Sequence, residues 1–130
     1  MDRFSQSFSI AASGMEAQSQ RLRHISENVA NVDTPGYRRK LIAFRDVVSG
    51  GEPTGSVRTG PVFLDRSPLE EIYDPSHPLA DATGHYEGTN VDLVLEIADA
   101  RQAQRSYEAN LKIFDQTRQM TRSLFELLRR

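Results

Sequence analysis

The residues most suggestive of chemistry are His77, Asp81 and His85, in which a carboxylate is flanked by histidines at steps of four residues. On one continuous helix this spacing would turn all three groups to the same face, where they could bind zinc. Pro78 and Gly84 interrupt the segment, and both residue types disfavour a helix interior. We therefore interpret the three side chains as turn residues and predict no metal site.

Four carboxylates elsewhere could be considered as acid–base pairs. They are Asp33, Asp92, Glu96 and Asp99. Helix caps and the positive N-terminal end of a helix dipole account for all four. The sequence also lacks a glycine-rich phosphate loop, a nucleophile elbow and an HExxH motif. We therefore predict no catalytic residue and no cofactor, and an enzyme is the least favoured class of function.

A basic run, Arg38-Arg39-Lys40, follows Tyr37. It fits the solvated start of a strand, and the alternative is a set of salt bridges to an acidic neighbouring subunit. No further basic stripe or aromatic platform continues the run, and the formal net charge of the chain is −2. We therefore predict no nucleic-acid partner.

The composition limits the size of the core and the class of protein. The 130 residues are enough for about one domain. The hydrophobic share of 38% is low beside the roughly 45–50% usual for globular domains. The absence of cysteine excludes disulfides and thiolate metal sites. No apolar run approaches the roughly 20 residues of a spanning helix, so we expect no direct membrane span.

Charge is distributed unevenly along the chain. Residues 1–40 carry a net charge of +2, residues 41–90 carry −5 and residues 91–130 carry +1. The acidic excess in the middle suits an outward-facing segment. The start of the sequence has no continuous apolar core of a secretory signal. If the protein works outside the cytoplasm, we expect export without a cleaved signal peptide.

Two stretches at opposite ends of the chain carry apolar residues at alternating steps of three and four, the pattern of a coiled-coil seam. The first series is Phe8, Ala11, Met15, Gln18, Leu22, Ile25, Val29 and Val32. The second is Leu93, Ile97, Ala100, Gln104, Tyr107, Leu111, Phe114, Arg118, Thr121, Phe125 and Leu128, with an adjacent stripe of Ile113, Met120, Leu124 and Leu127. We predict a mainly α fold in which long N- and C-terminal helices pack as a coiled-coil-like pair. The adjacent stripe is left for a neighbouring subunit.

The first helix has recognisable ends. Ser5 or Ser7 is placed to cap its start, and we expect it to run to about Asn31. An Asp-Thr-Pro-Gly sequence then ends it, because proline disfavours the α region for the preceding residue. We expect Gly36, at positive φ, and Tyr37 to form a fixed type II turn that aims the middle of the chain away from the helices.

Small residues surround Gly14 inside the first helix: Ala11, Ala12, Ser13 and Ala17. They would let another helix approach closely, and the alternative is plain tolerance of a glycine in a long helix.

The second helix begins after Thr89-Asn90-Val91-Asp92, which resembles a capping box with Asp in place of the usual Glu. We expect the helix to reach Leu128. Because three leucines fall within the last seven residues, we predict that the C-terminus is an assembly element.

The middle of the chain is punctuated by glycine and proline. Short stretches of strand character lie at residues 41–44, 56–58, 62–64 and 71–73. We predict a small β-hairpin or meander with irregular loops, in which residues 49–56 form a mobile loop. The predicted division is an N-terminal helix over residues 1–36, a small β/loop domain over 37–88 and a C-terminal helix over 89–130.

Two blocks of sequence contain specific residues that a helical period does not require. The first includes Ala30-Asn31-Val32-Asp33-Thr34-Pro35-Gly36-Tyr37, and the second includes Asn90-Val91-Asp92-Leu93, Glu96 and residues 103–110. In this order they resemble the N- and C-terminal signatures of bacterial flagellar rod and hook proteins, whose first signature ends in Ala-Asn-x-x-Thr-x-Gly-Tyr. The segment 73–86 resembles the one that precedes the C-terminal helix in proximal rod proteins, and the short middle agrees, since distal rod and hook proteins carry a much larger one.

The resemblance implies a structural subunit of the proximal rod of the flagellar basal body. It implies a hollow drive shaft of terminal helices, with the middle domain outside, that transmits torque and encloses the export channel. The implied partners are the protein itself, other flagellar rod proteins, the basal ring/rod junction protein and the flagellar export gate. The implied location is periplasmic, reached through the flagellar type III apparatus. The alternative is a soluble coiled-coil adaptor or regulatory protein.

The residues that we assign to assembly or to the family motif follow from the seam, the turn and the resemblance. They are Asn28, Asn31, Pro35, Gly36, Tyr37, Asn90, Asp92, Tyr107, Asn110, Phe114, Leu124, Leu127 and Leu128. A generic coiled coil has no need of Asn28, Asn31, Gly36, Tyr37 or Asn110.

Overall fold

The computed structural model describes residues 2–129 and has two long helices with two β-hairpins between them. The elements are α1 (Arg3–Ala30), β1 (Lys40–Ser49), β2 (Glu52–Leu64), β3 (Glu71–Tyr73), β4 (His85–Glu87) and α2 (Leu93–Leu128). The predicted fold class, two long terminal helices around a small β segment, is confirmed.

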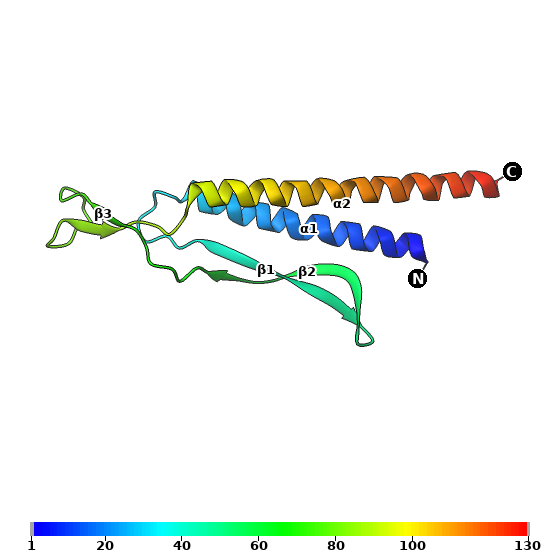
Figure 1. Cartoon of the computed structure of the whole chain (residues 1–130), viewed down its shortest axis with the longest axis horizontal. Coiled ribbons are helices and arrows are strands. Elements are labelled where there is room, and N and C mark those ends of the chain that lie inside the picture. The colour runs from blue at the N-terminus through cyan, green and yellow to red at the C-terminus, as the bar shows by residue number, and fades with distance from the viewer. Residues whose placement is uncertain (1, 130) are drawn as a thin grey trace.

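The two helices lie antiparallel and form the long axis of the molecule (Figure 1). With 36 residues, α2 is about 54 Å long, and its C-terminal end extends past the N-terminus of α1. The β1–β2 hairpin runs back along α1, whereas β3 and β4 project beyond the opposite end of the helix pair. The molecule therefore has an acidic β tip at one end and a helical overhang at the other.

The N-cap of α1 is Asp2, not Ser5 or Ser7 as predicted. Its carboxylate accepts a hydrogen bond from the Ser5 amide at 2.7 Å. A carboxylate at this position satisfies an orphan amide and faces the positive end of the helix dipole. The C-cap is Asn31, so the predicted end of this helix is confirmed.

The N-cap of α2 is Asp92 itself, whose carboxylate accepts from the Val94 amide at 3.0 Å. The predicted capping box beginning at Thr89 is therefore wrong. The Thr89 hydroxyl instead donates to the Val32 carbonyl at 2.9 Å and joins the segment before α2 to the end of α1. The predicted end of α2 at Leu128 is confirmed.

The strands β1 and β2 form one long antiparallel hairpin, with Lys40 opposite Leu64 and Ser49 opposite Glu52. The prediction of a mobile loop over residues 49–56 is wrong, because the strands are joined by Gly50 and Gly51 alone. Both glycines have positive φ, 59° and 84°, as the commonest two-residue hairpin turn requires.

Glycine and proline inside β2 mark bulges and not strand ends. Between the pairs Ile42–Val62 and Phe44–Thr59, two residues of β2, Gly60 and Pro61, lie opposite one residue of β1. Such bulges tolerate a residue without an amide proton. The strands predicted at residues 41–44, 56–58 and 62–64 are therefore parts of one continuous ribbon, whereas the strand predicted at 71–73 is β3 itself.

The core of the helix pair consists of small and polar side chains. The buried apolar residues are Ala11, Ala17, Ile25 and Ala103. Glu96, Ala103, Asn110 and Thr117, spaced by seven, lie along the seam of α2, together with half-buried Ala100, Tyr107, Phe114 and Thr121. Phe8 packs edge-on against Phe114, with 4.9 Å between ring centroids.

The predicted seam of α2 is thus only half correct. Its members Ala100, Tyr107, Phe114 and Thr121 are at least partly buried, but its other large apolar members are exposed. These are Leu93, Ile97, Leu111, Phe125 and Leu128. The period is right and the stripe is displaced, because a close approach at Gly14 and an ion pair at Glu96 select the neighbouring face.

The turn at the end of α1 has the predicted conformation. Gly36 has φ 78°, and the Tyr37 amide donates to the Thr34 carbonyl at 3.1 Å. The turn does not aim the middle of the chain away from the helices, however, because β1 returns along α1.

We expect Gly36→Val to lower the free energy of unfolding by about 1–2 kcal/mol, the cost of a left-handed backbone for a side chain with a Cβ. Apart from the two chain neighbours, no atom lies within 4 Å of a Cβ built at Gly36, so the Cβ itself meets no clash. Urea denaturation in buffer containing the osmolyte TMAO, which favours the folded state of marginal proteins, measures the change. The matched variant Gly36→Asn should cost clearly less, since Asn tolerates positive φ; equal costs for Val and Asn would contradict this explanation.

Gly14 is required by the close approach of the helices. A Cβ there would lie 2.6 Å from Asn110 Nδ2 and 2.8 Å from its Cγ. We expect Gly14→Ala to destabilise the helix pair, although alanine is the better helix former by about 1 kcal/mol. In an Asn110→Ala background the same substitution should stabilise. Urea denaturation with TMAO provides the test, and a destabilisation that persists without the Asn110 side chain would count against the contact.

Candidate assembly surface

A cluster of hydrogen-bonded polar side chains, here called the polar junction, joins the end of α1, the start of β1 and the first turns of α2. Its members are Asn28, Tyr37, Arg39, Asn90 and Glu96. It brings together three residues assigned from the sequence, Asn28, Tyr37 and Asn90, and two that were not, Arg39 and Glu96.

The buried Asn28 side chain acts as a pairing partner for the backbone of β1. Its Nδ2 donates to the Lys40 carbonyl at 3.1 Å, and its Oδ1 accepts from the Lys40 amide at 2.9 Å. The Tyr37 hydroxyl donates to the same Oδ1 at 2.8 Å. These bonds fix where β1 starts relative to α1.

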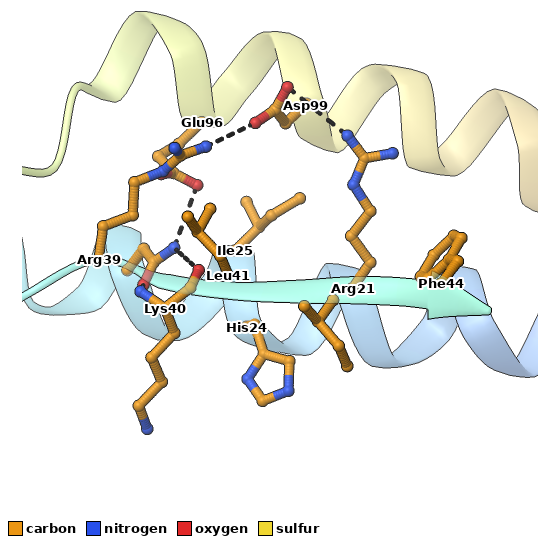
Figure 2. Close-up of a pocket in the computed structure, with 11 residues that line it drawn as sticks. Arg21, His24, Ile25, Arg39, Lys40, Leu41, Phe44, Glu96 and Asp99 are labelled. Carbon is orange, nitrogen blue, oxygen red and sulfur yellow. Dashed lines mark hydrogen bonds and ion pairs between the residues drawn. The ribbon is translucent and has the colours of Figure 1, made fainter. Parts of the chain in front are cut away.

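Ion pairs connect Arg39, the residue before β1, to α2. The Arg39 guanidinium donates from Nε to Glu96 and from Nη2 to Asp99, the latter at 2.8 Å. Glu96 is fully buried, with 0% of its side chain exposed, and Asp99 is also approached by Arg21 at 3.6 Å. Figure 2 shows this ladder of alternating charges between α1, β1 and α2.

Asn90 secures the segment that precedes α2. Its Oδ1 accepts from the Arg39 amide at 2.7 Å, and its Nδ2 donates to the Asp65 carbonyl at 2.9 Å. The guanidinium of Arg38 donates to that same carbonyl at 3.2 Å. The strand, the segment after β2 and the start of α2 are therefore held at one point.

Burial and ion pairing shift the pKa values of three side chains at the junction, Tyr37, Glu27 and Lys40. Burial raises the pKa of the Tyr37 phenol above its usual value, which keeps the hydroxyl protonated as a donor. The Lys40 ammonium, 2.6 Å from Glu27, lowers the pKa of that carboxyl. Glu27 in turn raises the pKa of Lys40. Each shift favours the state that the hydrogen bonds require at neutral pH.

Two sequence interpretations are wrong here. Arg39 is not part of a solvated strand start, because its largely buried guanidinium pairs with Glu96 and Asp99 of its own chain. Glu96 and Asp99 are more than residues near a helix start, since both bind Arg39. Neither Glu96 nor Ala103 belongs to the predicted seam, and only the structure shows that both are buried against α1.

The hollow beside the junction has a volume of about 310 Å³ and lies between β1, α1 and α2 (Figure 2). Arg21, Arg39, Glu96 and Asp99 line it, and all four take part in the ion pairs described above. The part of the chain that the structure describes contains no group of three side chains suited to a metal ion.

The histidines considered for zinc lie in the β3–β4 tip. The His77 ring stacks on Tyr86 with centroids 3.9 Å apart, and His85 lies near Tyr73 at 5.1 Å. Asp81 accepts from the amides of Thr83 and His85, so it serves as a turn residue. No helix within residues 2–129 is long and apolar enough to cross a membrane.

The other assigned residues lie in three places. Asn31, Pro35 and Gly36 form the turn after α1, where Asn31 Nδ2 donates to the Glu27 carbonyl at 2.8 Å. Asp92 caps α2. Tyr107, Asn110 and Phe114 lie along the seam, whereas Leu124, Leu127 and Leu128 lie far from the junction on the exposed end of α2.

Many large apolar side chains of α2 are exposed. Leu127 and Leu128 are 65% and 73% exposed. The other exposed apolar residues of this helix are Leu93, Val94, Leu95, Ile97, Leu111, Ile113, Met120, Leu124 and Phe125. Extended apolar surface of this kind marks an interaction site.

Comparison with known proteins finds family matches at both ends of the chain. Residues 8–38 match the family described as "Flagella basal body rod protein", and residues 82–127 match "Flagellar basal body rod FlgEFG protein C-terminal". The chain is similar to flagellar basal-body rod protein FlgC of Agrobacterium fabrum, with 44% identity in an alignment that covers 99% of this chain and 98% of that protein. It is also similar to FlgC of Salmonella typhimurium, at 36% identity with coverage of 87% and 89%, and to FlgC of Borreliella burgdorferi, at 35% identity with coverage of 94% and 95%.

Proposed function

Since the chain belongs to the bacterial flagellar basal-body rod protein family, among the relatives of FlgC, we propose that it builds the proximal part of the rod. It is a structural subunit of the flagellar basal body and assembles with other flagellar rod proteins. In the proposed assembly α1 and α2 form the inner wall of a hollow drive shaft that transmits torque and encloses the export channel. The β-hairpins lie outside that wall.

One observation carries this proposal: most large apolar side chains of α2 are exposed, and few apolar side chains are buried between the helices. The helix pair buries alanines, Ile25 and polar groups, while the leucines, the isoleucines and Phe125 of α2 are exposed. A free monomer would expose this surface to water at a cost of about 25 cal/mol per Å². Packing against neighbouring subunits buries it, so the core is completed only in the assembly.

The proposed partners are further copies of this chain, other rod proteins, the ring/rod junction protein and the export gate. The proposed location is the periplasmic part of the basal body, reached through the flagellar type III apparatus and not by a cleaved signal peptide. We also propose that the protein is not an enzyme. The polar groups of the junction bind one another, which supports a purely structural role.

A soluble coiled-coil adaptor is not favoured. An adaptor has no need of the bonds from Asn28 and Asn90 to β1, whereas a subunit that transmits torque needs its hairpin fixed to its helices. The family membership points the same way.

Electron microscopy of purified basal bodies tests the proposal. A compact tag inserted between Gly50 and Gly51, at the exposed tip of the β1–β2 hairpin, should leave the helix pair intact. Label density is expected on the part of the rod nearest the basal ring. Label found only on the distal rod or hook, or none on rods of motile cells that carry the tagged copy alone, would contradict the proposal.

A further inference from the structure

The C-terminal overhang, residues 122–129, consists of the last turns of α2 and its C-cap, and Phe8 of α1 borders it. Phe8, near the start of α1, packs at Phe114, so the last turns of α2 lie beyond α1 (Figure 1). Arg122, Phe125 and Arg129 line a hollow there together with Phe8. Among residues 2–129, neither Arg122 nor Arg129 forms an ion pair. The overhang therefore presents apolar side chains beside two arginines that form no ion pair with another described residue, and beside one carboxylate, Glu126.

The β3–β4 tip, at the other end of the molecule, has the opposite charge. It carries a hollow of about 410 Å³, lined by Pro35, Glu71, Leu79, Asp81, Tyr86 and Glu87 among others. Leu79 is 63% exposed, so an apolar side chain lies among carboxylates. Hydrogen bonds from Thr83 hold the pKa of Asp81 below its usual value, which keeps that carboxylate ionised.

Two carboxylates in the tip, Glu71 and Glu87, repel each other, and a bound cation would relieve this repulsion. Glu71 and Glu87 lie directly opposite each other in the β3–β4 register, and both are exposed. Like charges at such a position destabilise a two-stranded sheet. Within residues 2–129 neither carboxylate is paired with a basic side chain. A basic partner that binds across both strands would remove this repulsion.

We propose that the overhang of one subunit docks into the acidic hollow of the β3–β4 tip of a second copy of this chain. Arg122 and Arg129 then face Glu71 and Glu87, while Phe125 or a neighbouring leucine contacts Leu79. The inference rests on the proposed function, and it specifies which surfaces meet.

The positions of the two surfaces support a contact between copies. They lie at opposite ends of a molecule whose longer helix spans about 54 Å, so one chain cannot join its own two ends. A contact between two different surfaces leaves one of each free on every new copy. Such head-to-tail contacts extend into open helical assemblies, as a rod requires.

Disulfide trapping tests the contact directly, since the sequence contains no cysteine to interfere. The variant carrying both Leu79→Cys and Phe125→Cys, concentrated and mildly oxidised, should form a ladder of dimers, trimers and longer species. The yield should fall as ionic strength rises from about 50 to about 500 mM. A control carrying Val48→Cys, on the hairpin, with Phe125→Cys should form no such ladder.

Charge reversal in the same cysteine background provides the second arm. Glu71→Arg with Glu87→Arg should reduce the ladder roughly tenfold, and adding Arg122→Glu and Arg129→Glu should restore most of it. The matched control Asp46→Arg, an exposed carboxylate of β1, should leave the yield unchanged.

The outcomes separate this inference from the function on which it rests. A salt-sensitive ladder with rescue by the reciprocal reversal supports the contact. Absence of a ladder, or a ladder indifferent to both reversals, overturns it, while the rod assignment stands if the tagged subunit is found in the proximal rod. A tagged subunit absent from the rod would overturn the proposed function, whatever the trapping shows.

Discussion

Deleting residues 124–130 is expected to abolish rod formation while leaving a chain that is exported and stays soluble. Leu124, Leu127 and Leu128 are exposed in the monomer and contribute nothing to its own core. Burial of each leucine against a neighbour contributes roughly 1.5–3 kcal/mol, and every subunit repeats the contact. Loss of three such contacts per subunit exceeds what a weak interface can tolerate.

Two measurements check this prediction: electron microscopy of basal bodies, and detection of the truncated chain in the secreted fraction. A triple variant with glutamine at the three leucine positions should behave like the truncation. A control with Gln116→Ala and Gln119→Ala, on exposed polar positions of the same helix, should assemble normally. Normal basal bodies in cells whose only copy lacks residues 124–130 would refute the assembly role of this end.

The second large effect is expected at the polar junction. Glu96→Ala should lower the free energy of unfolding by about 3 kcal/mol or more, because it removes the fully buried carboxylate and leaves the largely buried Arg39 guanidinium with two partly exposed partners, Asp99 at 2.8 Å and Asp65 at 3.8 Å. Arg39→Ala should cost a similar amount by leaving Glu96 buried and unpaired. The double variant Arg39→Met with Glu96→Leu should lose much less, since an apolar pair often replaces a buried ion pair without penalty.

A double-mutant cycle by urea denaturation in TMAO measures the coupling between Arg39 and Glu96. The matched control is the exposed pair of Arg118 and Asp115, 3.2 Å apart, which should contribute less than about 1 kcal/mol. If Glu96→Ala costs no more than the control substitution Asp115→Ala, the junction does not hold the fold together as described.

How far the sequence predicts this fold differs between its elements. Both long helices follow from the 3.5-residue period, and their predicted ends at Asn31 and Leu128 are confirmed. Which stripe of α2 faces α1 could not be predicted, because two adjacent stripes share that period and the more apolar one is exposed. In a subunit whose neighbours supply part of the core, hydrophobicity does not distinguish intramolecular from intermolecular faces.

The β segments show a different limit of sequence reasoning. Gly60 and Pro61 resemble strand ends when read locally, but the pairing of β1 with β2 accommodates them as a bulge. The strand β4, His85–Glu87, has three residues and no recognisable pattern, and only its pairing with β3 defines it.

The polar junction was predicted in part. The family motif identified Asn28, Tyr37 and Asn90, whose side chains do meet the start of β1. Arg39 and Glu96 were missed because their partnership depends on tertiary contact across 57 residues of sequence. Glu96 lies on neither predicted stripe of α2, so the periodicity did not point to a buried partner for it.

The central claim is that neighbouring subunits complete the core, and the helicity of the dilute monomer tests it most directly. Circular dichroism of the chain, shown to be monomeric by sedimentation, should report far less helix than the 28 residues of α1 and 36 residues of α2. The signal should rise as concentration drives assembly or as TMAO is added. Full helicity in a dilute solution that contains only monomer would contradict the claim, because the helix pair would then be stable without its neighbours.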